Sequence, residues 1–264
     1  MSGIDSAQPR RTTFSDQVLS ATGVVLLLGI WTVAAHSGRF SQLIVIPPLD
    51  VLATLRELLS SGELTLHLGQ SFHRLANGFM AGGIAGIVWG ALMAVSVNFS
   101  AATAPVFNAV RQVPSVAFIP LLILVFGIGE TFKIVIVAKA AFFPIALSSC
   151  NAIRAISRNH LEIAKIYRLS PLARLRYVIW PGALSNLLTG VRLGLGKSWA
   201  VLVAAELFAA DFGIGQLMES GRQLFRLDVV FVGVLITGVI GYLLDRGLQF
   251  IERRLTAWNT SEAV

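Results

Sequence analysis

The chain has 264 residues, of which 55% are hydrophobic and only 13% are charged, and its formal net charge is +7. Soluble domains carry about 25% charged residues, so this composition excludes an ordinary soluble protein and indicates an integral membrane protein. The positive charge does not indicate nucleic-acid binding, because the basic residues lie beside apolar runs and in loops and form no continuous basic face.

The motifs of catalytic and metal-binding proteins are missing from the sequence. Cys150 is the single cysteine, which excludes an intrachain disulfide, and the four histidines lack metal-ligand spacing. Neither HExxH nor GxSxG occurs, and no glycine-rich nucleotide loop is present. We therefore expect no catalytic residue, metal or cofactor on this chain, and any ATP must bind another chain.

Apolar runs predict about six membrane-spanning helices, each near the roughly 20 residues that a bilayer requires. Helices are expected because lipid offers backbone groups no other hydrogen-bond partner. The predicted spans are Val18–Ala35, Leu75–Val97, Thr103–Phe126, Ile134–Ile153, Thr189–Ala210 and Val229–Leu244.

The first run follows Arg10 and Arg11 and superficially resembles a signal peptide. It is longer than the roughly 7–15 residues of a signal h-region, so we interpret it as a retained span after a cytoplasmic tail, residues 1–16. Beyond it, Pro47, Pro48 and Asp50 predict the start of a short helix on the outer side that ends near Leu59.

The second and third spans carry unusual residues. Glycines at every fourth position place one close-approach face on the second span, which favours packing within the subunit over a dimer seam; they are Gly78, Gly82, Gly86 and Gly90. Pro105, Pro114 and Pro120 break the third span, and such prolines serve packing or mark kinked helices that line cavities.

A polar, basic stretch from Arg154 to Arg176 separates the fourth and fifth spans, and its charge places it on the cytoplasmic side. Apolar residues recur in it near helical spacing, which predicts short amphipathic helices; they are Leu161, Ala164, Ile166 and Leu169. An even number of spans then puts both termini inside. The excess of basic residues on the cytoplasmic side is imperfect, because the predicted outer loops carry Arg39, Arg56, Arg222 and Arg226.

This stretch resembles the cytoplasmic coupling loop of permease subunits of bacterial ATP-binding-cassette (ABC) importers. The family pattern is Glu-Ala-Ala, three residues, Gly, nine residues, Ile, one residue, Leu-Pro, and Glu162, Ala164 and Pro181 match it. Arg168 stands at the glycine position, where glycine would allow a positive-φ turn that arginine adopts only at a cost. Either the turn accommodates arginine or docking differs in detail. The other departures are Ile163, Val178 and Trp180.

Further segments resemble the sulfonate, taurine and nitrate branch of these permeases, most closely the aliphatic sulfonate permeases. They include Ser71–Phe79, Val113–Leu121, Phe126–Glu130 and Val203–Glu206 with Gly213–Gly215. The resemblance implies an all-α membrane protein with about six transmembrane helices in the type I ABC importer permease fold. Residues 17–258 would form the permease domain, 154–181 its coupling loop and 259–264 a C-terminal tail.

The resemblance also implies partners and a function. Two permease subunits, expected to be a homodimer, would enclose the pathway in the bacterial inner membrane. Cytoplasmic ATPases would bind the coupling loops, and a periplasmic binding protein would deliver an aliphatic sulfonate, with taurine, nitrate or another small anion as alternatives. The implied coupling residues are Glu162, Ala164, Lys165, Arg168 and Pro181. A secondary transporter is the rival, but it needs no docking loop and often shows an internal repeat, which we do not see.

Charged residues within spans are costly and are therefore candidates for the substrate pathway. Arg111 and Arg192 match family positions, where they serve either the pathway or contacts with lipid phosphate and helix ends. For Glu206 we expect a structural role, either in an ion pair or in a contact with a helix end. Lys139 and Lys197 replace residues that are usually apolar in the family and predict an anion site, with Ser115, Ser198 and Arg111 beside the pathway. In the alternative, Lys139 snorkels to the interface and Lys197 pairs with Glu206 across subunits.

Overall fold

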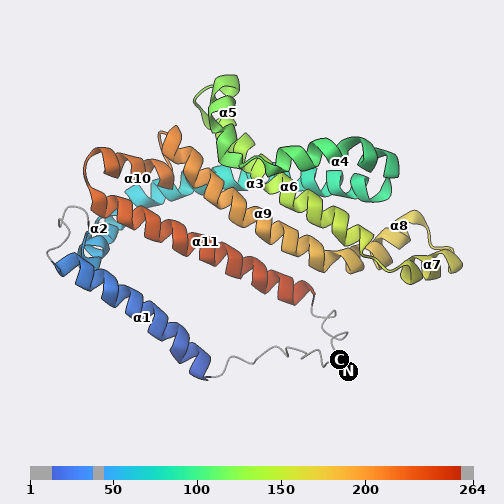
Figure 1. Ribbon diagram of the computed structural model, residues 1–264, viewed down its shortest axis with the longest axis horizontal. Helices are drawn as coiled ribbons and strands as arrows, with labels where there is room; N and C mark the ends of the chain where they lie inside the picture. The colour runs from blue at the N-terminus through green and yellow to red at the C-terminus, as the bar shows by residue number, and fades with distance from the viewer. Residues whose placement is uncertain (1–13, 38–44, 257–264) are drawn as a thin grey trace.

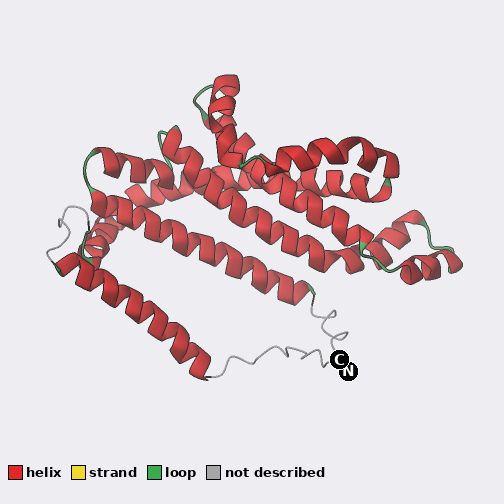
Figure 2. Ribbon diagram, viewed as in Figure 1, coloured by secondary structure: helices red, strands yellow, loops and turns green. Residues whose placement is uncertain are grey.

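The computed structural model describes residues 14–37 and 45–256. The predicted C-terminal tail and all but the last three residues of the predicted N-terminal tail lie outside these ranges. Within them the chain forms helices joined by loops, with no strand (Figure 2). The all-α prediction is therefore confirmed for the described residues.

Thirteen helical segments make up the described chain. In order they are α1 (Phe14–His36), α2 (Pro48–Ser60), α3 (Glu63–Val95), α4 (Val97–Gln112), η1 (Ser115–Phe118), α5 (Ile119–Phe126), α6 (Glu130–Arg154), α7 (Arg158–Ile166), α8 (Pro171–Arg174), η2 (Leu175–Ile179), α9 (Trp180–Phe208), α10 (Ile214–Gln223) and α11 (Leu227–Leu255). The short helix predicted to start at Pro47–Asp50 is confirmed as α2.

Long helices form the body of the molecule. Helix α6 packs along both α3 and α9, and α11 packs along α9. Helices α2 and α10 lie at one end of this body, whereas α7 and α8 lie at the other (Figure 1). Helix α1 packs on α2, and its Trp31 ring stacks on Phe231 of α11 at 5.6 Å between centroids.

Four helical stretches among the described residues are long and apolar enough to cross a membrane. They are α3, α6, Leu172–Phe208, which includes α9, and α11. The α4–α5 pair makes a fifth if it counts as one broken span. Helix α1 covers the predicted first span but is not one of these, so for that span only helix formation is confirmed.

The predicted third span is not one helix. Val97–Gln112 and Ser115–Phe126 meet at an angle of 94°. Val113 adopts an extended conformation at the break, as expected for a residue before proline, and Pro114 cannot donate a backbone hydrogen bond. Of the three prolines in this span, Pro114 therefore causes the break. Pro105 lies inside continuous α4, and Pro120 lies in the first turn of α5.

The glycine face of α3 packs against α6, as predicted for contact within the subunit. A Cβ atom on Gly78 would lie 2.7 Å from the carbonyl oxygen of Ile134, and one on Gly86 would lie 2.8 Å from that of Phe142. Cβ atoms on Gly82 and Gly90 would overlap the backbone of Ala138 and Ala146. Two helix backbones can approach this closely only where side chains are absent.

Candidate functional site: coupling loop, buried charges and pocket

The loop between α6 and α9 contains α7, α8 and one turn of π-helix, η2, which confirms the short helices predicted for it. It lies at the end of the body opposite α2 and α10 (Figure 1). Pro181 lies in the first turn of α9, which directly follows η2, and within the continuous helical stretch Leu172–Phe208.

Arg168 adopts the left-handed conformation that a glycine would favour. Its φ is +50°, and it lies two residues beyond the end of α7. A non-glycine residue pays roughly 1–2 kcal/mol for this conformation. The first alternative is therefore correct: the turn keeps the geometry that a glycine permits and accommodates arginine, whose side chain is exposed.

Ala164 packs inside the loop rather than on its surface. It is only 2% exposed, and its carbonyl oxygen accepts a hydrogen bond from the Leu169 N–H at 3.0 Å. Glu162, two residues earlier, is exposed. Lys165 lies on the same helix, and its side chain lies outside the described part of the structure. Of the matched pair in α7, only Glu162 can reach a partner directly.

Large apolar side chains protrude from this polar loop. Tyr167 is 76% exposed, and Ile166 and Leu172 are equally accessible. Helical spacing grouped Ile166 with Ala164, but Ile166 is exposed and Ala164 is buried, so sequence reasoning missed this surface. We call Glu162, Ile166, Tyr167 and Leu172 the loop surface.

Lys139 and Ser115, two of the predicted pathway residues, come together. The ammonium of half-buried Lys139 on α6 donates to the Ser115 hydroxyl at 3.3 Å. It also lies 4.0 Å from the Phe118 ring centroid and 5.4 Å from that of Phe143, both cation–π distances. Among the described residues no carboxylate forms an ion pair with this lysine.

The other predicted pathway residues lie apart from that pair. Lys197 is exposed on α9 and makes no hydrogen bond or ion pair within the described ranges. Ser198 is fully buried and donates to the Val137 carbonyl at 3.2 Å, so its contact is one of helix packing between α9 and α6. Arg111 is exposed in the last turn of α4, where it donates to Asn108 at 2.9 Å.

An ionic network centred on buried Arg74 joins α3, α6 and α9. Arg74 donates Nε and Nη2 to Glu130 at 2.6 and 2.8 Å, and its Nη1 donates to Glu206 at 2.8 Å. Buried Lys133 also donates to Glu130, at 2.9 Å. Arg74 and Glu206 are almost completely inaccessible. Sequence reasoning missed Arg74 as the partner of Glu206, and it missed Glu130 and Lys133 as the other members of the network.

Glu206 also receives hydrogen bonds from neutral donors. The Ser71 hydroxyl lies 2.8 Å from its carboxylate, and the Gly215 N–H in the first turn of α10 donates at 3.1 Å. The predicted structural roles of Glu206, an ion pair and a helix-end contact, are both confirmed. In the described subunit its carboxylate is already engaged by Arg74.

Arg192 likewise makes ion pairs between helices. Its guanidinium lies 2.7 Å from Asp245 and 3.5 Å from Glu252, both on α11. Glu252 lies in the last turn of α11, so this ion pair agrees with the helix-end contact left open for Arg192.

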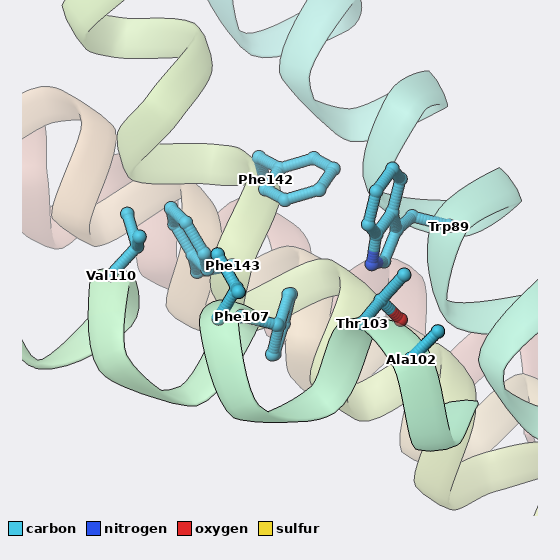
Figure 3. Close-up of a pocket in the computed structure, with 8 residues that line it drawn as sticks. Trp89, Ala102, Thr103, Phe107, Val110, Phe142 and Phe143 are labelled. Carbon is cyan, nitrogen blue, oxygen red and sulfur yellow. The ribbon is translucent and has the colours of Figure 1, made fainter. Parts of the chain in front are cut away.

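An aromatic pocket of about 360 Å³ lies between α3, α4 and α6 (Figure 3). Its lining is almost entirely apolar and consists of Trp89, Ala102, Thr103, Val106, Phe107, Val110, Phe142 and Phe143. The Trp89 Nε1 atom is buried and has no hydrogen-bond partner. No group of three or more His, Cys, Asp or Glu residues in the described chain could hold a metal ion.

Comparison with known proteins defines the class to which this fold and loop belong. Residues 82–257 match the family described as binding-protein-dependent transport system inner membrane component. The chain belongs to this family: it is the multi-pass inner-membrane permease subunit of an ABC importer of the sulfonate and taurine branch, and the ATPase is a separate subunit.

Two curated relatives are similar over nearly their whole length. The chain is 36% identical to a putative aliphatic sulfonates transport permease protein of Bacillus subtilis, covering 89% of this chain and 86% of the relative. It is 35% identical to the taurine transport system permease protein of Escherichia coli, covering 94% and 93%. A solved structure of the MetNI methionine ABC transporter in an inward-facing conformation matches with a TM-score of 0.60 and 21% identity, over 71% of this chain and 93% of that chain. This match supports the type I permease fold.

Proposed function

We propose that this permease carries a small organic anion, with aliphatic sulfonates as the first candidates, across the inner membrane. Lys139 carries this proposal: it is a half-buried cation on a spanning helix that no described carboxylate neutralises. Such a charge is costly in a membrane, and a passing anion would offset the cost. Relatives named for aliphatic sulfonates and for taurine, itself a sulfonate, support the same class.

Lys197 and Arg111 would extend the path for an anion. Both are exposed, and Lys197 occurs about midway along α9. Ser115 would hold the Lys139 ammonium and offer a further hydroxyl to the anion. Nitrate is the alternative cargo, because a nitrate import permease of Synechocystis is 26% identical over 92% of the chain.

Transport would be driven by alternating access in a larger assembly. Two copies of this chain would enclose the pathway, cytoplasmic ATPases would dock on the loop surface, and a periplasmic binding protein would deliver the anion. The end with α7 and α8, together with both termini, would then be cytoplasmic, and the end with α2 and α10 would be periplasmic. ATP binding would close the ATPases and move α7 and α8 with them.

Growth of the native host with this gene deleted, on single sulfur or nitrogen sources, tests the proposal. We expect loss of growth on one or more alkanesulfonates and normal growth on sulfate. A plasmid with the wild-type gene or with Arg222→Met, a change at an exposed surface residue, should restore growth, whereas Lys139→Met should not. Normal growth of the deletion strain on every sulfonate would contradict the proposed cargo. Full uptake by a Lys139→Met, Lys197→Met double variant would contradict the anion site.

A further inference from the structure

We propose that the aromatic pocket between α3, α4 and α6 receives the apolar body of the transported organic anion, with its anionic head near Lys139 and Arg111. The inference rests on the proposed function and narrows it to anions with an alkyl or aryl group. Under this inference the pocket helps to select the substrate, so part of the selectivity lies in the permease itself.

The pocket has the size and walls of a small-molecule site. Its volume of about 360 Å³ lies in the range of roughly 300–1,000 Å³ that such sites occupy. Aromatic rings brace one another around it, with centroid distances of 5.1 Å for Phe107 and Phe143 and 5.0 Å for Phe142 and Phe143. Rings in mutual contact form a preformed, mostly apolar wall that suits methylene groups.

Two cations, Lys139 and Arg111, lie at one side of this pocket. The Lys139 ammonium is 5.4 Å from the ring centroid of Phe143, a lining residue one turn further along α6. Arg111 follows the lining residue Val110 directly and is four residues beyond Phe107 on α4. In Figure 3, Val110 and Phe143 lie on one side of the pocket, and Trp89, Ala102 and Thr103 lie on the other. An anion with its charged head and apolar body at opposite ends would place its head on the side of Val110 and Phe143. Arg154 lies beyond the other side, where its guanidinium is already bonded to the Met93 carbonyl and the Ser100 hydroxyl.

The far side of the pocket offers a hydrogen bond. Trp89 Nε1 is buried without an acceptor, which is unfavourable unless a ligand or water supplies one. Figure 3 shows this nitrogen on the side of the indole that faces Thr103. The Thr103 hydroxyl donates to the Phe99 carbonyl at 2.7 Å, so its proton is already used. An acceptor on the distal end of the anion, such as a hydroxyl oxygen, would therefore pair with Trp89.

Binding of a homologous series of alkanesulfonates to the purified permease–ATPase complex in nanodiscs tests the assignment. Because the binding protein is omitted, a dependence on chain length reports on the permease. From ethanesulfonate to hexanesulfonate we expect affinity to rise about three- to fourfold per methylene, as burial of a methylene group predicts. Inorganic sulfate should bind most weakly, and Trp89→Phe should remove any advantage of a terminal hydroxyl.

Val106 gives a variant that fills the pocket without disturbing the core, since it lines the pocket yet is 65% exposed. Val106→Trp should abolish the chain-length dependence and leave ethanesulfonate binding intact. Val97→Trp is the matched control, because Val97 is on the same helix, is 82% exposed and does not line the pocket. It should behave as the wild type.

Three results would overturn the assignment. They are a wild-type affinity that does not depend on chain length, a dependence that survives Val106→Trp, and quenching of Trp89 fluorescence by brominated phospholipid chains. The last result, measured as the difference between the wild type and Trp89→Phe, would show that membrane lipid occupies the pocket. Uptake of a short sulfonate by the complete system separates the two proposals. Normal uptake together with any of these three results would contradict only the pocket assignment. Absence of uptake of every sulfonate would contradict the proposed function.

Discussion

Arg74 on α3 donates to Glu206 on α9 at 2.8 Å, and the two side chains are 2% and 0% exposed. Arg74 also donates two hydrogen bonds to Glu130 at the start of α6, so one guanidinium connects three long helices. Glu206 in turn accepts the Gly215 N–H and thereby fixes the start of α10. This network sets the relative positions of these helices where they meet α10.

Arg74→Met should destabilise the permease by about 3–5 kcal/mol, because it leaves Glu206 buried without its ionic partner. The free energy of unfolding can be measured by denaturant titration in mild micelles. Arg222→Met is the control, because the Arg222 side chain on α10 is 66% exposed, although it pairs with half-buried Glu219. The hydrogen bond from Arg222 lowers the pKa of Glu219 to about 2, yet water reaches the exposed Arg222 guanidinium, so loss of the pair should change stability little. Equal losses in the two variants would contradict a special role for the network around Arg74.

Gly82→Ala should destabilise the α3–α6 contact by about 1–3 kcal/mol, since the added methyl overlaps the backbone of Ala138. Gly69→Ala is the matched control on the same helix, because nothing lies within 4 Å of its new methyl. There the better helix propensity of alanine should leave stability unchanged or raise it by up to about 1 kcal/mol. Thermal unfolding of the purified variants measures both effects, and a harmless Gly82→Ala would show that the two backbones are further apart.

The positions of the helices could be predicted from apolar runs, but the start of α3 could not. The helix begins at Glu63, twelve residues before the predicted Leu75. Its early part carries His67, Ser71 and Arg74, which look like loop residues until their partners are known. Those partners are Gly213, Glu206 and Glu130, all more than 50 residues away in the chain. Apolar periodicity reports local burial and says nothing about polar groups that are satisfied by distant ones.

The candidate site likewise depends on packing between segments that the sequence does not reveal. The family resemblance left two alternatives open for Arg168, and only the structure, with its φ of +50°, shows that the turn accommodates arginine. The burial of Ala164 and the exposure of Tyr167 could not be predicted, since they depend on how α7 packs on the rest of its loop. The pocket likewise arises from three helices, and its residues lie from Trp89 to Phe143.

Arg168→Gly should preserve the loop and the co-purification of the ATPase, because glycine adopts a φ of +50° without steric cost. Arg168→Val should reduce co-purification, since a β-branched residue tolerates this conformation poorly. Quantifying the ATPase bound per permease after affinity purification distinguishes the variants. Equal binding by the glycine and valine variants would mean that the turn does not position α7 for docking.

Single-cysteine labelling should place the two ends of the body on opposite sides of the membrane. In a Cys150→Ala background, Asp50→Cys should react with an impermeant maleimide applied from the periplasm, because Asp50 is exposed on α2. His160→Cys on α7 should react only after the membrane is permeabilised. Labelling of position 160 from the periplasm would overturn the proposed orientation.

ATP-driven uptake of radiolabelled taurine or ethanesulfonate into proteoliposomes, with the ATPase and binding protein supplied, tests the central claim most directly. The wild type should accumulate the anion only with ATP. Tyr167 is 76% exposed, and Tyr167→Asp puts a charge on the loop surface. This variant should abolish both uptake and ATPase binding without lowering the yield of folded permease. Ala164→Asp is less informative, because it buries a charge inside the loop. Leu224→Asp, 72% exposed at the opposite end, should leave ATPase binding intact. Undiminished uptake by Tyr167→Asp, or no ATP-dependent uptake by the wild type, would contradict the account.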